Sequence, residues 1–286
     1  MANILKGAAV ATAINEATAI EVEKLKQSGI TPTLAIVRIG ERDDDISYER
    51  GATKRCEKVG VTVKNIILPN KCSEKTLIET IEQLNNDSSV HGVLLFRPLP
   101  KHINDNNVRN TLSPTKDIDG ITDSSLAGVF TGTDLGFAPC TARACIEILD
   151  FYNIDVTGKR TMVIGRSLVV GKPVAIMLMD KNATVTICHT KTIDMPLCCR
   201  EADILIVSAG RAGIINKDYF NSNQIIIDVG INITEEGKLC GDVDFDTANA
   251  IVDSITPVPG GVGTVTTSVL VRNVVIAAKR QFNEIV

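Results

Sequence analysis

The sequence predicts an α/β protein built from two α/β domains in tandem. In the first half of the chain, short runs with the composition of strands alternate with longer segments whose apolar residues recur at helical spacing. The second half contains a further series of short runs that are almost wholly apolar, as expected of parallel strands covered by helices on both faces. The strand-like runs are TLAIVRIG, VTVKNIILP and VHGVLLF in the first series, and TMVIG, ATVTICH, ADILIVSAG and QIIIDVG in the second. We therefore expect a mostly parallel sheet in the second domain.

Helices are expected between these strands and at the end of the chain. Residues 8–28, 46–59 and 73–86 have the apolar spacing of helices that bury one face. The segment TSVLVRNVVIAAKRQF is also amphipathic, and we expect it to pack back on the first domain. The predicted domains are 1–138 together with 264–286, and 139–263.

Composition and charge exclude several classes of partner. The net charge is −4 and the chain has no basic run of the kind that binds a phosphate backbone or an anionic bilayer, so we expect neither a nucleic acid nor a membrane partner. No apolar stretch is expected to span a bilayer, and Asn3, Lys6 and Glu16 interrupt the N-terminus where a signal peptide has an apolar core, so we expect a cytoplasmic protein. Adjacent Cys198 and Cys199 lack a matching set of ligands, so we predict reduced cysteines and no metal site.

The segment VIGRSLVVGKPVAIML, which begins at Val163, predicts a phosphate-binding turn. A strand ends at Gly165, a turn follows, and Pro173 stands in the first turn of a helix, where its missing N–H costs nothing. Gly165 and Gly171 would let the backbone approach a pyrophosphate, Ser167 adds a hydroxyl, and the helix N-terminus supplies free N–H groups. The spacing is one residue longer than GxGxxG, and a tight turn without a ligand is the alternative. The second domain is therefore predicted to be a Rossmann-type nucleotide-binding domain.

The end of the next strand predicts which nicotinamide nucleotide is bound. A site for NAD usually places an acidic residue here to bind two ribose hydroxyls. The chain has His189, Thr190, Lys191 and Thr192 instead. Arg166 and the hydroxyl of Thr190 could hold a 2′-phosphate, so we predict NADP as the cofactor, with NAD as the alternative. His189 is either a direct ligand or a solvent-facing residue that caps the strand end.

A third glycine-rich loop, TPVPGGVGTVT, lies between the last strand and the C-terminal helix. It contains Gly260, Gly261 and Gly263. Glycines at this density predict that a planar ligand lies against the backbone, and the nicotinamide is the natural candidate. An interdomain hinge is a second interpretation and does not exclude the first.

Long motifs spread along the chain occur in the order of one protein family. They are RPLPKHI, PTKDIDG, PCTARACIEIL, GRSLVVGKP, ATVTICHTKT, ADILIVSAG, IIIDVGIN, GDVDF and ITPVPGGVGTVT. With these motifs the chain resembles the methylenetetrahydrofolate dehydrogenase/cyclohydrolase family over nearly its whole length. The resemblance implies a folate-binding domain closed by the C-terminal helix, a Rossmann-type domain, a cleft between them and a homodimer. It also implies a small-molecule folate substrate.

The resemblance assigns roles to individual residues. Tyr48 matches the tyrosine that lines the folate site and Asp119 matches the aspartate that hydrogen-bonds the pterin, so these two are the expected catalytic residues. From the residues alone, Asp119 could instead cap the turn before Gly120, and Asp117 is expected to be structural. The substrate-binding residues that the resemblance implies are Tyr48, Phe96, Pro98, Leu99, Pro100, Asp119, Gly260 and Gly261. The cofactor-binding residues that it implies are Gly165, Arg166, Ser167, Val170, Gly171, His189, Thr190, Gly210, Ile231, Gly261 and Thr266.

The chain departs from the family pattern in the helix that carries the tyrosine. The family has lysines four and six positions after this tyrosine, where the chain has Ala52 and Lys54. Two residues rotate a helix by roughly 200°, so Lys54 should point away from the face shared by Tyr48 and Ala52. Phe96 replaces the glutamine that hydrogen-bonds the first lysine of the family. Thr264 stands where the family usually has proline, and it could cap the following helix.

These departures predict which half of the family's chemistry survives. Hydride leaves the methylene carbon between N5 and N10 of the folate, and those nitrogens stabilise the cation, so this step needs alignment rather than a protein base. Hydrolysis of the methenyl product needs proton transfer by a positioned group. We therefore expect oxidation of 5,10-methylenetetrahydrofolate with hydride transfer to NADP, and cyclohydrolase activity that is absent or very weak. The alternatives are a bifunctional enzyme that uses Lys54 or Arg97, and a catalytically silent folate- or nucleotide-binding subunit.

Overall fold

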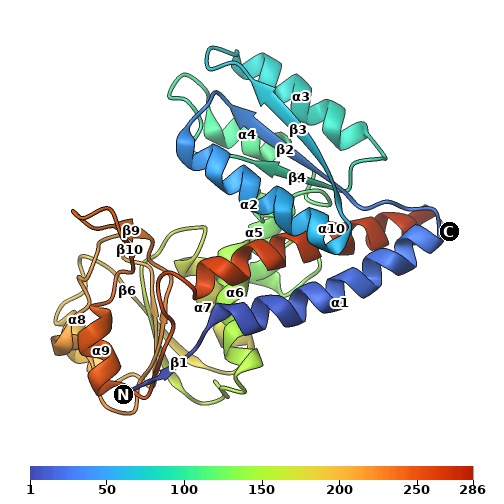
Figure 1. Cartoon of the computed structure of the whole chain (residues 1–286). Helices are drawn as coiled ribbons and strands as arrows, with labels where there is room; N and C mark the ends of the chain where they lie inside the picture. The colour runs from blue at the N-terminus through green and yellow to red at the C-terminus, as the bar shows by residue number, and fades with distance from the viewer. Residues whose placement is uncertain (286) are drawn as a thin grey trace. The chain divides into compact units, whose positions relative to one another are not determined.

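A computed structural model of the chain describes residues 1–285 (Figure 1). The chain forms two compact units. Unit 1 comprises Met1–Thr12 and Thr141–Thr266, and unit 2 comprises Ala13–Cys140 and the C-terminal residues from Thr267 onward. This division differs from the predicted domains at the N-terminus, where residues 1–12 belong to unit 1. The reason is that β1 (Asn3–Ile4) pairs in parallel with β11 (Ser254–Ile255).

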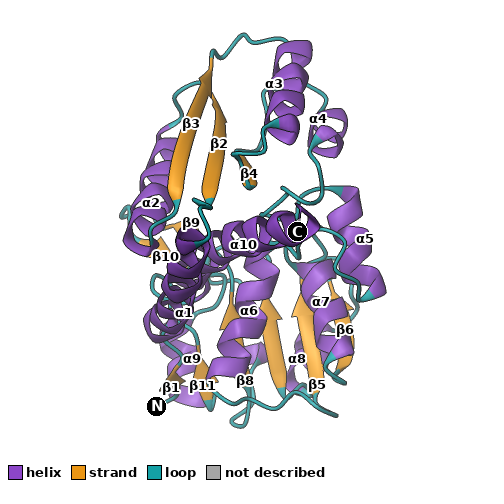
Figure 2. Cartoon of the chain, turned by 90° about the vertical axis from the view of Figure 1, so that its right-hand side faces the viewer, coloured by secondary structure: helices purple, strands orange, loops and turns teal. Residues whose placement is uncertain are grey.

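Unit 2 is built on a three-stranded parallel sheet with the strand order β3-β2-β4 (Figure 2). The strands are β2 (Thr33–Ile39), β3 (Thr62–Leu68) and β4 (Gly92–Leu95). The helices are α1 (Gly7–Gln27), which begins in unit 1, α2 (Asp43–Val59), α3 (Glu74–Asn86), α4 (Asp105–Thr111), α5 (Asp123–Thr131) and most of α10 (Val262–Ile285). Ala35 and Val37 of β2 pack with apolar residues of α3 and α4 on one face of the sheet. Because side chains alternate along a strand, Leu34, Ile36 and Arg38 lie on the opposite face.

Unit 1 contains a six-stranded sheet in which each pairing is parallel, with the order β1-β11-β8-β7-β5-β6. Its further strands are β5 (Arg160–Ile164), β6 (Thr184–Cys188), β7 (Ile204–Val207) and β8 (Ile225–Asp228), and β9 (Asn232–Ile233) and β10 (Leu239–Cys240) form a separate antiparallel pair. Its helices are α6 (Cys140–Phe151), α7 (Gly171–Asp180), α8 (Met195–Arg200), α9 (Phe245–Ile251) and the short η1 (Lys217–Tyr219). The predicted α/β fold with a mostly parallel second sheet is confirmed. The chain passes from β5 to β6 on one side and then to β7 on the other, and the carboxyl ends of strands at such a reversal form the usual ligand crevice.

The C-terminal helix corrects one expectation about membranes. Within the part of the chain that the structure describes, Val262–Asn283 of α10 is long and apolar enough to cross a bilayer, so the expectation that no apolar stretch reaches this length is wrong. However, 67% of its most apolar window is buried inside the protein. Val269, Leu270 and Val274 are fully buried, as in the core helix of a folded unit.

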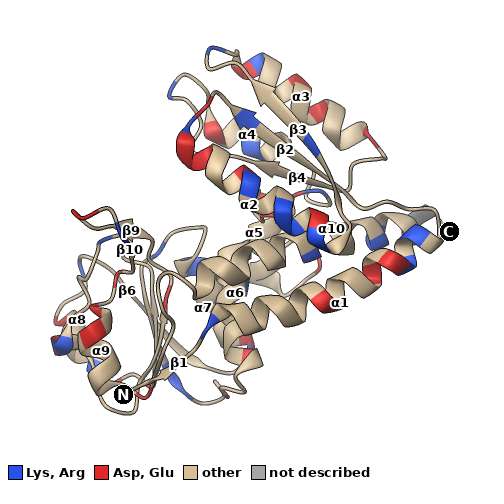
Figure 3. Cartoon of the chain, in the orientation of Figure 1, with Lys and Arg blue, Asp and Glu red and all other residues tan. Residues whose placement is uncertain are grey.

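Charged residues of both signs are spread over the helices of the two units, and α2 begins with a distinct acidic stretch (Figure 3). Asp43, Asp44 and Asp45 form its first turn, where negative charge stabilises the helix through the dipole. Residue 43 is three positions before the predicted start of this helix. The helix ends at Gly60, which has a φ of 85° and donates its N–H to the carbonyl oxygens of the last turn.

Candidate active site

The turn between β5 and α7 can be formed only by glycine at two positions. Gly165 has a φ of 117°, and a Cβ there would lie 2.4 Å from the carbonyl oxygen of Ser208. A Cβ at Gly171 would lie 2.2 Å from the carbonyl oxygen of Gly165. A larger residue at either position would therefore displace backbone. Both predicted glycines are therefore explained by the turn itself.

The N-terminus of α7 has backbone donors without a side-chain cap. Val170, at the N-cap position, makes no side-chain cap hydrogen bond. Ser167 Oγ accepts a hydrogen bond from the Val170 N–H at 3.1 Å and keeps its own O–H proton to donate. Arg166 is exposed on the same turn. The Lys172 N–H donates to the carbonyl oxygen of Ser167 at 3.0 Å and Pro173 has no N–H, so the first turn of α7 offers mainly the Gly171 N–H. Together with the helix dipole, the Ser167 hydroxyl and the Arg166 guanidinium, this is a donor set suited to an anionic phosphate.

The end of β6 forms a tight polar turn. The His189 N–H donates to Thr192 Oγ1 at 2.9 Å, and His189 Nδ1 accepts from the Lys191 N–H at 3.1 Å. Because Nδ1 is an acceptor, the neutral imidazole carries its proton on Nε2. Thr190 and Lys191 are exposed. His189 therefore caps the strand end through Nδ1, which accepts from the Lys191 N–H, and Nε2 is the ring atom that could contact a ligand.

The loop after β7, which contains the predicted residue Gly210, is held by a buried carboxylate that the sequence analysis missed. Asp242 accepts hydrogen bonds from the N–H groups of Ala209 at 2.6 Å, Gly210 at 2.8 Å and Arg211 at 2.9 Å. It also accepts from Asn232 Nδ2 at 2.9 Å. Asp242 is fully buried. The only available signal was its place in the GDVDF motif, which does not reveal contacts with a loop more than 30 residues away.

A second buried carboxylate holds the loop after β8. Asp228 accepts from the N–H groups of Gly230 at 2.9 Å, Asp242 at 3.1 Å and Val243 at 3.0 Å. Burial raises the pKa of Asp228 to about 6, although these three hydrogen bonds oppose the shift. The predicted residue Ile231 follows this loop and is 68% exposed, so it is available for contact with a ligand. The two aspartates thus order the backbone at the carboxyl ends of β7 and β8.

The glycine-rich loop before α10 packs against the start of α1. Gly260 has a φ of 102°, and its carbonyl oxygen accepts from the Gly7 N–H at 2.8 Å. A Cβ at Gly261 would lie 2.5 Å from the carbonyl oxygen of Pro257, and a Cβ at Gly7 would lie 2.2 Å from the carbonyl oxygen of Gly261. A Cβ at Gly263 would meet its nearest neighbour at 3.7 Å, which is ordinary contact. Close backbone packing therefore accounts for Gly260 and Gly261 even without a ligand.

Two threonines near this loop have their hydrogen-bonding groups engaged within the first turns of α10. Because α10 begins at Val262, Thr264 lies inside its first turn and donates its N–H to the carbonyl oxygen of Gly261. The expectation that Thr264 caps the helix is therefore wrong. Thr266 is buried and donates its hydroxyl to the carbonyl oxygen of Val262 at 3.1 Å, so this proton is already bound within the helix.

In unit 2, the aromatic rings of Tyr48 and Phe96 are in contact. Their centroids lie 5.7 Å apart at an interplanar angle of 80°, which is an edge-to-face arrangement. Tyr48 is 40% exposed, so part of its ring remains free for a ligand. Burial around the hydroxyl, followed by the negative charge of Asp119, raises the pKa of Tyr48, and a hydrogen bond with Thr267 opposes this. Tyr48 therefore remains a neutral phenol at physiological pH.

The two aspartates of the KDIDG motif have different environments. Asp117 is fully buried and accepts from the Ile121 N–H at 3.0 Å, the Thr122 N–H at 2.8 Å and the Ser125 hydroxyl at 2.7 Å. Asp117 is therefore the residue that organises this turn. For Asp119, burial first and the nearby Asp117 second raise the pKa to about 7. This separation supports a structural role for Asp117 and leaves Asp119 as the candidate ligand-binding carboxylate.

The positions of the expected lysine and glutamine are apolar and buried. Ala52 is completely buried, and Phe96 is 9% exposed and contacts Tyr48. Lys54 is exposed, in agreement with the predicted rotation away from Ala52. The site side of α2 therefore carries no amine at these positions.

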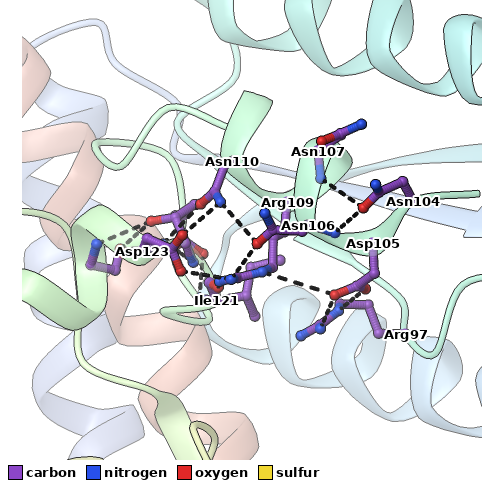
Figure 4. A network of polar contacts seen from close by, with 12 residues as sticks. Arg97, Asn104, Asp105, Asn106, Asn107, Arg109, Asn110, Ile121 and Asp123 are labelled. Carbon is purple, nitrogen blue, oxygen red and sulfur yellow. Dashed lines mark hydrogen bonds and ion pairs between the residues drawn. The ribbon is translucent and has the colours of Figure 1, made fainter.

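Arg97, the other basic residue considered for hydrolysis, belongs to a surface network of polar contacts (Figure 4). Its Nε donates to Asp105 Oδ1 at 2.6 Å, and a second guanidinium nitrogen contacts the other carboxylate oxygen. Arg109 extends the network to Asp123 at 2.6 Å and to the carbonyl oxygen of Ile121 at 2.9 Å. Both guanidinium nitrogens that face Asp105 are engaged in this bidentate contact, and a guanidinium has donors but no acceptor, so Arg97 is poorly suited to act as a base.

The rest of the RPLP segment is divided between the surface and the core. Pro98 is exposed, and its carbonyl oxygen accepts from Arg42 at 3.2 Å. Leu99 packs against the apolar cluster shared by β2, α3 and α4. The carbonyl oxygen of Pro100 accepts from the Ile103 N–H at 3.0 Å. Of these residues, Pro98 has the most surface available to a substrate.

The fold and these local geometries define a class of protein. A parallel sheet with a glycine-bounded turn at its reversal point, together with ordered loops after the neighbouring strands, is the architecture of a dinucleotide-binding oxidoreductase. Unit 2 places the ring of Phe96, the hydroxyl of Tyr48 and the Asp119 carboxylate, whose pKa is raised, near one another.

Sequence and structure comparisons identify the family within this class. Residues 139–282 match the NAD(P)-binding domain of the tetrahydrofolate dehydrogenase/cyclohydrolase family, and residues 5–119 match its catalytic domain. The chain therefore belongs to the tetrahydrofolate dehydrogenase/cyclohydrolase family and is a methylenetetrahydrofolate dehydrogenase.

Three relatives illustrate the extent of the similarity. The bifunctional protein FolD of Clostridium botulinum is 47% identical over 280 residues, which cover 98% of this chain and 99% of the relative. The crystal structure of the bifunctional FolD of Campylobacter jejuni matches with a TM-score of 0.96 at 37% identity, covering 98% of this chain and 99% of the other. The FolD of Trypanosoma brucei, solved with NADP and an inhibitor, matches with a TM-score of 0.92 at 32% identity and covers 98% of both chains.

Proposed function

We propose that the protein oxidises 5,10-methylenetetrahydrofolate to 5,10-methenyltetrahydrofolate, transfers the hydride to NADP and has little or no cyclohydrolase activity. The observation that carries this proposal is that Ala52 and Phe96 are buried and apolar at the two positions where the resemblance implies a catalytic lysine and glutamine. A buried methyl group and a phenyl ring can neither activate water nor protonate a folate nitrogen. Hydride transfer makes no such demand, because the folate nitrogens stabilise the cation that is formed.

The proposed folate-binding residues are those of unit 2 that combine exposure with suitable chemistry. The partly exposed ring of Tyr48 would stack on the substrate, and Phe96 would support it by edge-to-face contact. Asp119 would accept hydrogen bonds from the amino and ring N–H groups of the pterin. Because its pKa is raised to about 7, it is substantially ionised only near and above neutral pH before the ligand binds. Pro98 would contribute apolar surface, and Leu99 would act through the core beneath it.

The proposed nucleotide-binding residues are those of the loops at the carboxyl ends of the strands in unit 1. The turn from Gly165 to Gly171 would bind the pyrophosphate, and the loop at Gly210 and the loop at Gly260 and Gly261 would border the rest of the cofactor. Arg166 and Thr190 favour NADP over NAD because both can bind a 2′-phosphate and residues 189–192 contain no opposing carboxylate. The NADP complex of the Trypanosoma brucei relative supports this choice.

A bifunctional enzyme is the second candidate, and the names of the relatives favour it. The Clostridium botulinum and Campylobacter jejuni proteins are both described as bifunctional. In this chain a substitute base would have to be Lys54 or Arg97. Lys54 is exposed and points away from the face of α2 that carries Ala52. The guanidinium of Arg97 is paired with Asp105 and is therefore not free to act as a base. We therefore favour the loss of hydrolysis.

One assay distinguishes the proposal from its alternatives. Purified enzyme is supplied with methylenetetrahydrofolate and NADP, and the nicotinamide and methenyl absorbances are followed separately in a buffer where spontaneous hydrolysis is slow. We expect stoichiometric accumulation of both products. Decay of added methenyl compound that depends on the enzyme, at a rate near that of hydride transfer, would support the bifunctional alternative. An absence of nicotinamide reduction with either NADP or NAD would indicate a silent subunit.

A gain-of-function variant tests the missing pair directly. Ala52→Lys combined with Phe96→Gln is expected to introduce slow hydrolysis of the methenyl compound, whereas Lys54→Ala should leave dehydrogenase turnover unchanged. General acid–base groups contribute on the order of 10²- to 10⁴-fold, so even a poorly positioned lysine should give a measurable rate. Loss of residual hydrolysis in Lys54→Ala would instead assign the base to that residue.

We also propose that the protein is a cytoplasmic homodimer, as the family resemblance implies. Sedimentation at the mass of a single chain over micromolar concentrations would contradict the dimer.

A further inference from the structure

The half of α2 that carries Tyr48 has little apolar anchorage. The fully buried residues of this helix are Ala52, Cys56 and Val59, all in its C-terminal half. None of residues 43–51 is fully buried, and the N-cap residue Arg42 makes no side-chain cap hydrogen bond. Gly51 lies between the two halves, and a Cβ there would touch nothing within 4 Å. Hydrophobic packing therefore fixes the end of this helix better than its beginning.

A buried ion pair connects the beginning of α2 to the sheet. Arg38, near the end of β2, donates from Nε to Glu49 Oε2 at 2.8 Å, and the two side chains are only 6% and 13% exposed. A second nitrogen of Arg38 donates to the carbonyl oxygen of Gly40. Glu49 is the residue immediately after Tyr48. The guanidinium is thus held by its own strand end while it binds the helix turn that contains the tyrosine.

The same strand register places this pair beside Phe96. Val37 of β2 is opposite Leu95 of β4, and the Phe96 N–H donates to the carbonyl oxygen of Val37 at 3.0 Å. Phe96 follows β4 directly, so continuation of the register places it next to Arg38, on the face opposite to Val37 and Leu95. Since Phe96 contacts Tyr48 and Glu49 follows Tyr48 in the chain, the ion pair and the aromatic pair both join this turn of α2 to the same edge of the sheet.

We propose that Arg38 and Glu49 are positioning residues that hold Tyr48 in place for the folate. The inference rests on the proposed folate-binding role of Tyr48. A charge-assisted hydrogen bond has a fixed direction, whereas apolar contact is largely non-directional, so the pair can set the orientation of this helix turn. Two further polar contacts of this region, Arg42 with Asp45 at 3.7 Å and Arg42 with the carbonyl oxygen of Pro98, use a side chain that is 47% exposed and are screened by solvent.

The first test removes the pairing charge with a nearly isosteric change. Glu49→Gln is expected to lower kcat/KM for methylenetetrahydrofolate about tenfold or more, because small misplacements of substrate-positioning groups are costly, and to change KM for NADP less than twofold. The matched control is Glu57→Gln, which makes the same change at an exposed position of the same helix and should leave both constants within twofold of the wild type. An unchanged kcat/KM in Glu49→Gln, or an equal change in KM for NADP, would overturn the proposal.

The second test asks whether the pair acts through Tyr48. In a Tyr48→Ala background, Glu49→Gln should lower kcat/KM for the folate by less than twofold, because the group that it positions is already absent. The same loss in both backgrounds would mean that Glu49 acts independently of the tyrosine. Because a buried unpaired arginine can impair folding, the thermal midpoint of each variant is measured in parallel.

The third test separates the ion pair from general stability. Replacement of both charges in Arg38→Leu with Glu49→Leu should restore the thermal midpoint toward the wild-type value, since paired apolar residues can replace a buried ion pair. The folate kcat/KM should remain reduced about tenfold, since the directional contact is gone. Recovery of both quantities would show that packing alone suffices and would overturn the proposal. If the wild-type enzyme does not oxidise methylenetetrahydrofolate at all, the proposed function fails, which is distinct from each of these results.

Discussion

The candidate site of unit 1 is formed mainly by backbone groups, whereas that of unit 2 is formed mainly by side chains. In unit 1 the predicted nucleotide site consists largely of backbone, shaped by Gly165 and Gly171 and ordered by two buried carboxylates. In unit 2 the predicted folate site consists of side chains, and the buried apolar residues Ala52 and Phe96 stand where the resemblance led us to expect a lysine and a glutamine. A backbone site is lost only when its geometry is broken. A side-chain site can lose one reaction step by substitution and keep another.

The largest expected effect breaks the backbone geometry of unit 1. In Gly165→Val, the new side chain would meet the Ser208 carbonyl at a φ of 117°, so the turn cannot form. We expect NADP-dependent turnover to fall by at least roughly 100-fold, because the pyrophosphate contacts are lost. Equilibrium binding measurements on Gly165→Val check this prediction: the affinity for NADP should fall, and the affinity for a folate analogue should not. A parallel loss of folate affinity in a folded variant would show that the two sites are not separable.

A similarly specific effect is expected from a carboxylate in unit 2. Asp119→Ala should lower kcat/KM for the folate roughly 100-fold, because buried pterin N–H groups would lose a charged partner. NADP affinity should stay within twofold of the wild type. Asp117→Asn is the comparison variant. It should lower the thermal midpoint, because Asp117 accepts three hydrogen bonds within its own turn. A large loss of NADP affinity in Asp119→Ala would reassign this residue to a structural role.

The raised pKa of Asp119 also predicts a pH dependence of stability. Its folded pKa is about 7, against an ordinary value of 3.8, so the folded state favours the protonated form. The contribution to the free energy of unfolding is therefore fully present below about pH 4 and is lost as the pH rises through 7. Denaturant titrations between pH 4 and pH 8 should show a shallower decline in Asp119→Asn than in the wild type. Identical slopes for the two proteins would contradict the shift.

A smaller effect is expected from the carboxylate that orders the loop after β7. Asp242→Asn keeps the shape of the side chain but replaces one of its two acceptor oxygens by an NH₂ group. This NH₂ group cannot accept from the N–H groups of Ala209, Gly210 and Arg211, which the two oxygens of Asp242 bind. We expect KM for NADP to rise about tenfold, with KM for the folate unchanged, since a lost charge-assisted contact is worth roughly 1.5–3 kcal/mol. Steady-state kinetics with each substrate varied in turn provide the measurement. A change confined to the folate would be the opposite of the expected pattern.

The smallest expected effect removes only a hydroxyl. Tyr48→Phe keeps the ring that contacts Phe96 and loses the hydrogen bond with Thr267. We expect a decrease in kcat/KM of only about three- to tenfold, because one neutral hydrogen bond contributes roughly 0.5–1.5 kcal/mol. Tyr48→Ala, which also removes the ring, should be clearly worse. Equal losses in the two variants would place the function of Tyr48 in its hydroxyl.

The sequence was informative where the signal is local and periodic. The strand patterns predicted the three strands of the unit 2 sheet and β5, β6, β7 and β8 of the unit 1 sheet, but not the two-residue strands β1 and β11 at its edge or the pair β9 and β10. The rotation along one helix correctly placed Lys54 on an exposed face away from Ala52. The start of α2 was placed too late, because a run of aspartates reads as a loop although it stabilises a helix N-terminus. The capping role given to Thr264 failed because the helix begins two residues earlier, directly after the glycines.

The residues that the sequence did not reveal depend on contacts between distant segments. Asp242 is adjacent to a glycine in a short motif, but its function depends on the loop around Gly210. The pairing of Arg38 with Glu49 depends on the packing of a helix turn on the end of a strand. Neither contact has a periodicity or a composition that marks it, so only the folded chain shows that these charges are buried and paired.

The C-terminal helix has a consequence for the biosynthesis of the protein. Residues 13–140 leave the ribosome early, but unit 2 also requires Val269, Leu270 and Val274 for its core and Asn273 for a hydrogen bond to the carbonyl oxygen of Ile118. These residues are synthesised only after the whole of Thr141–Thr266, which belongs to unit 1. Unit 2 therefore cannot complete its core until the intervening segment of unit 1 and α10 have been translated, and the emerging chain carries an exposed apolar surface in the meantime. Removal of α10 would take away these core residues and the Asn273 hydrogen bond, so the rest of unit 2 would keep its apolar surface exposed.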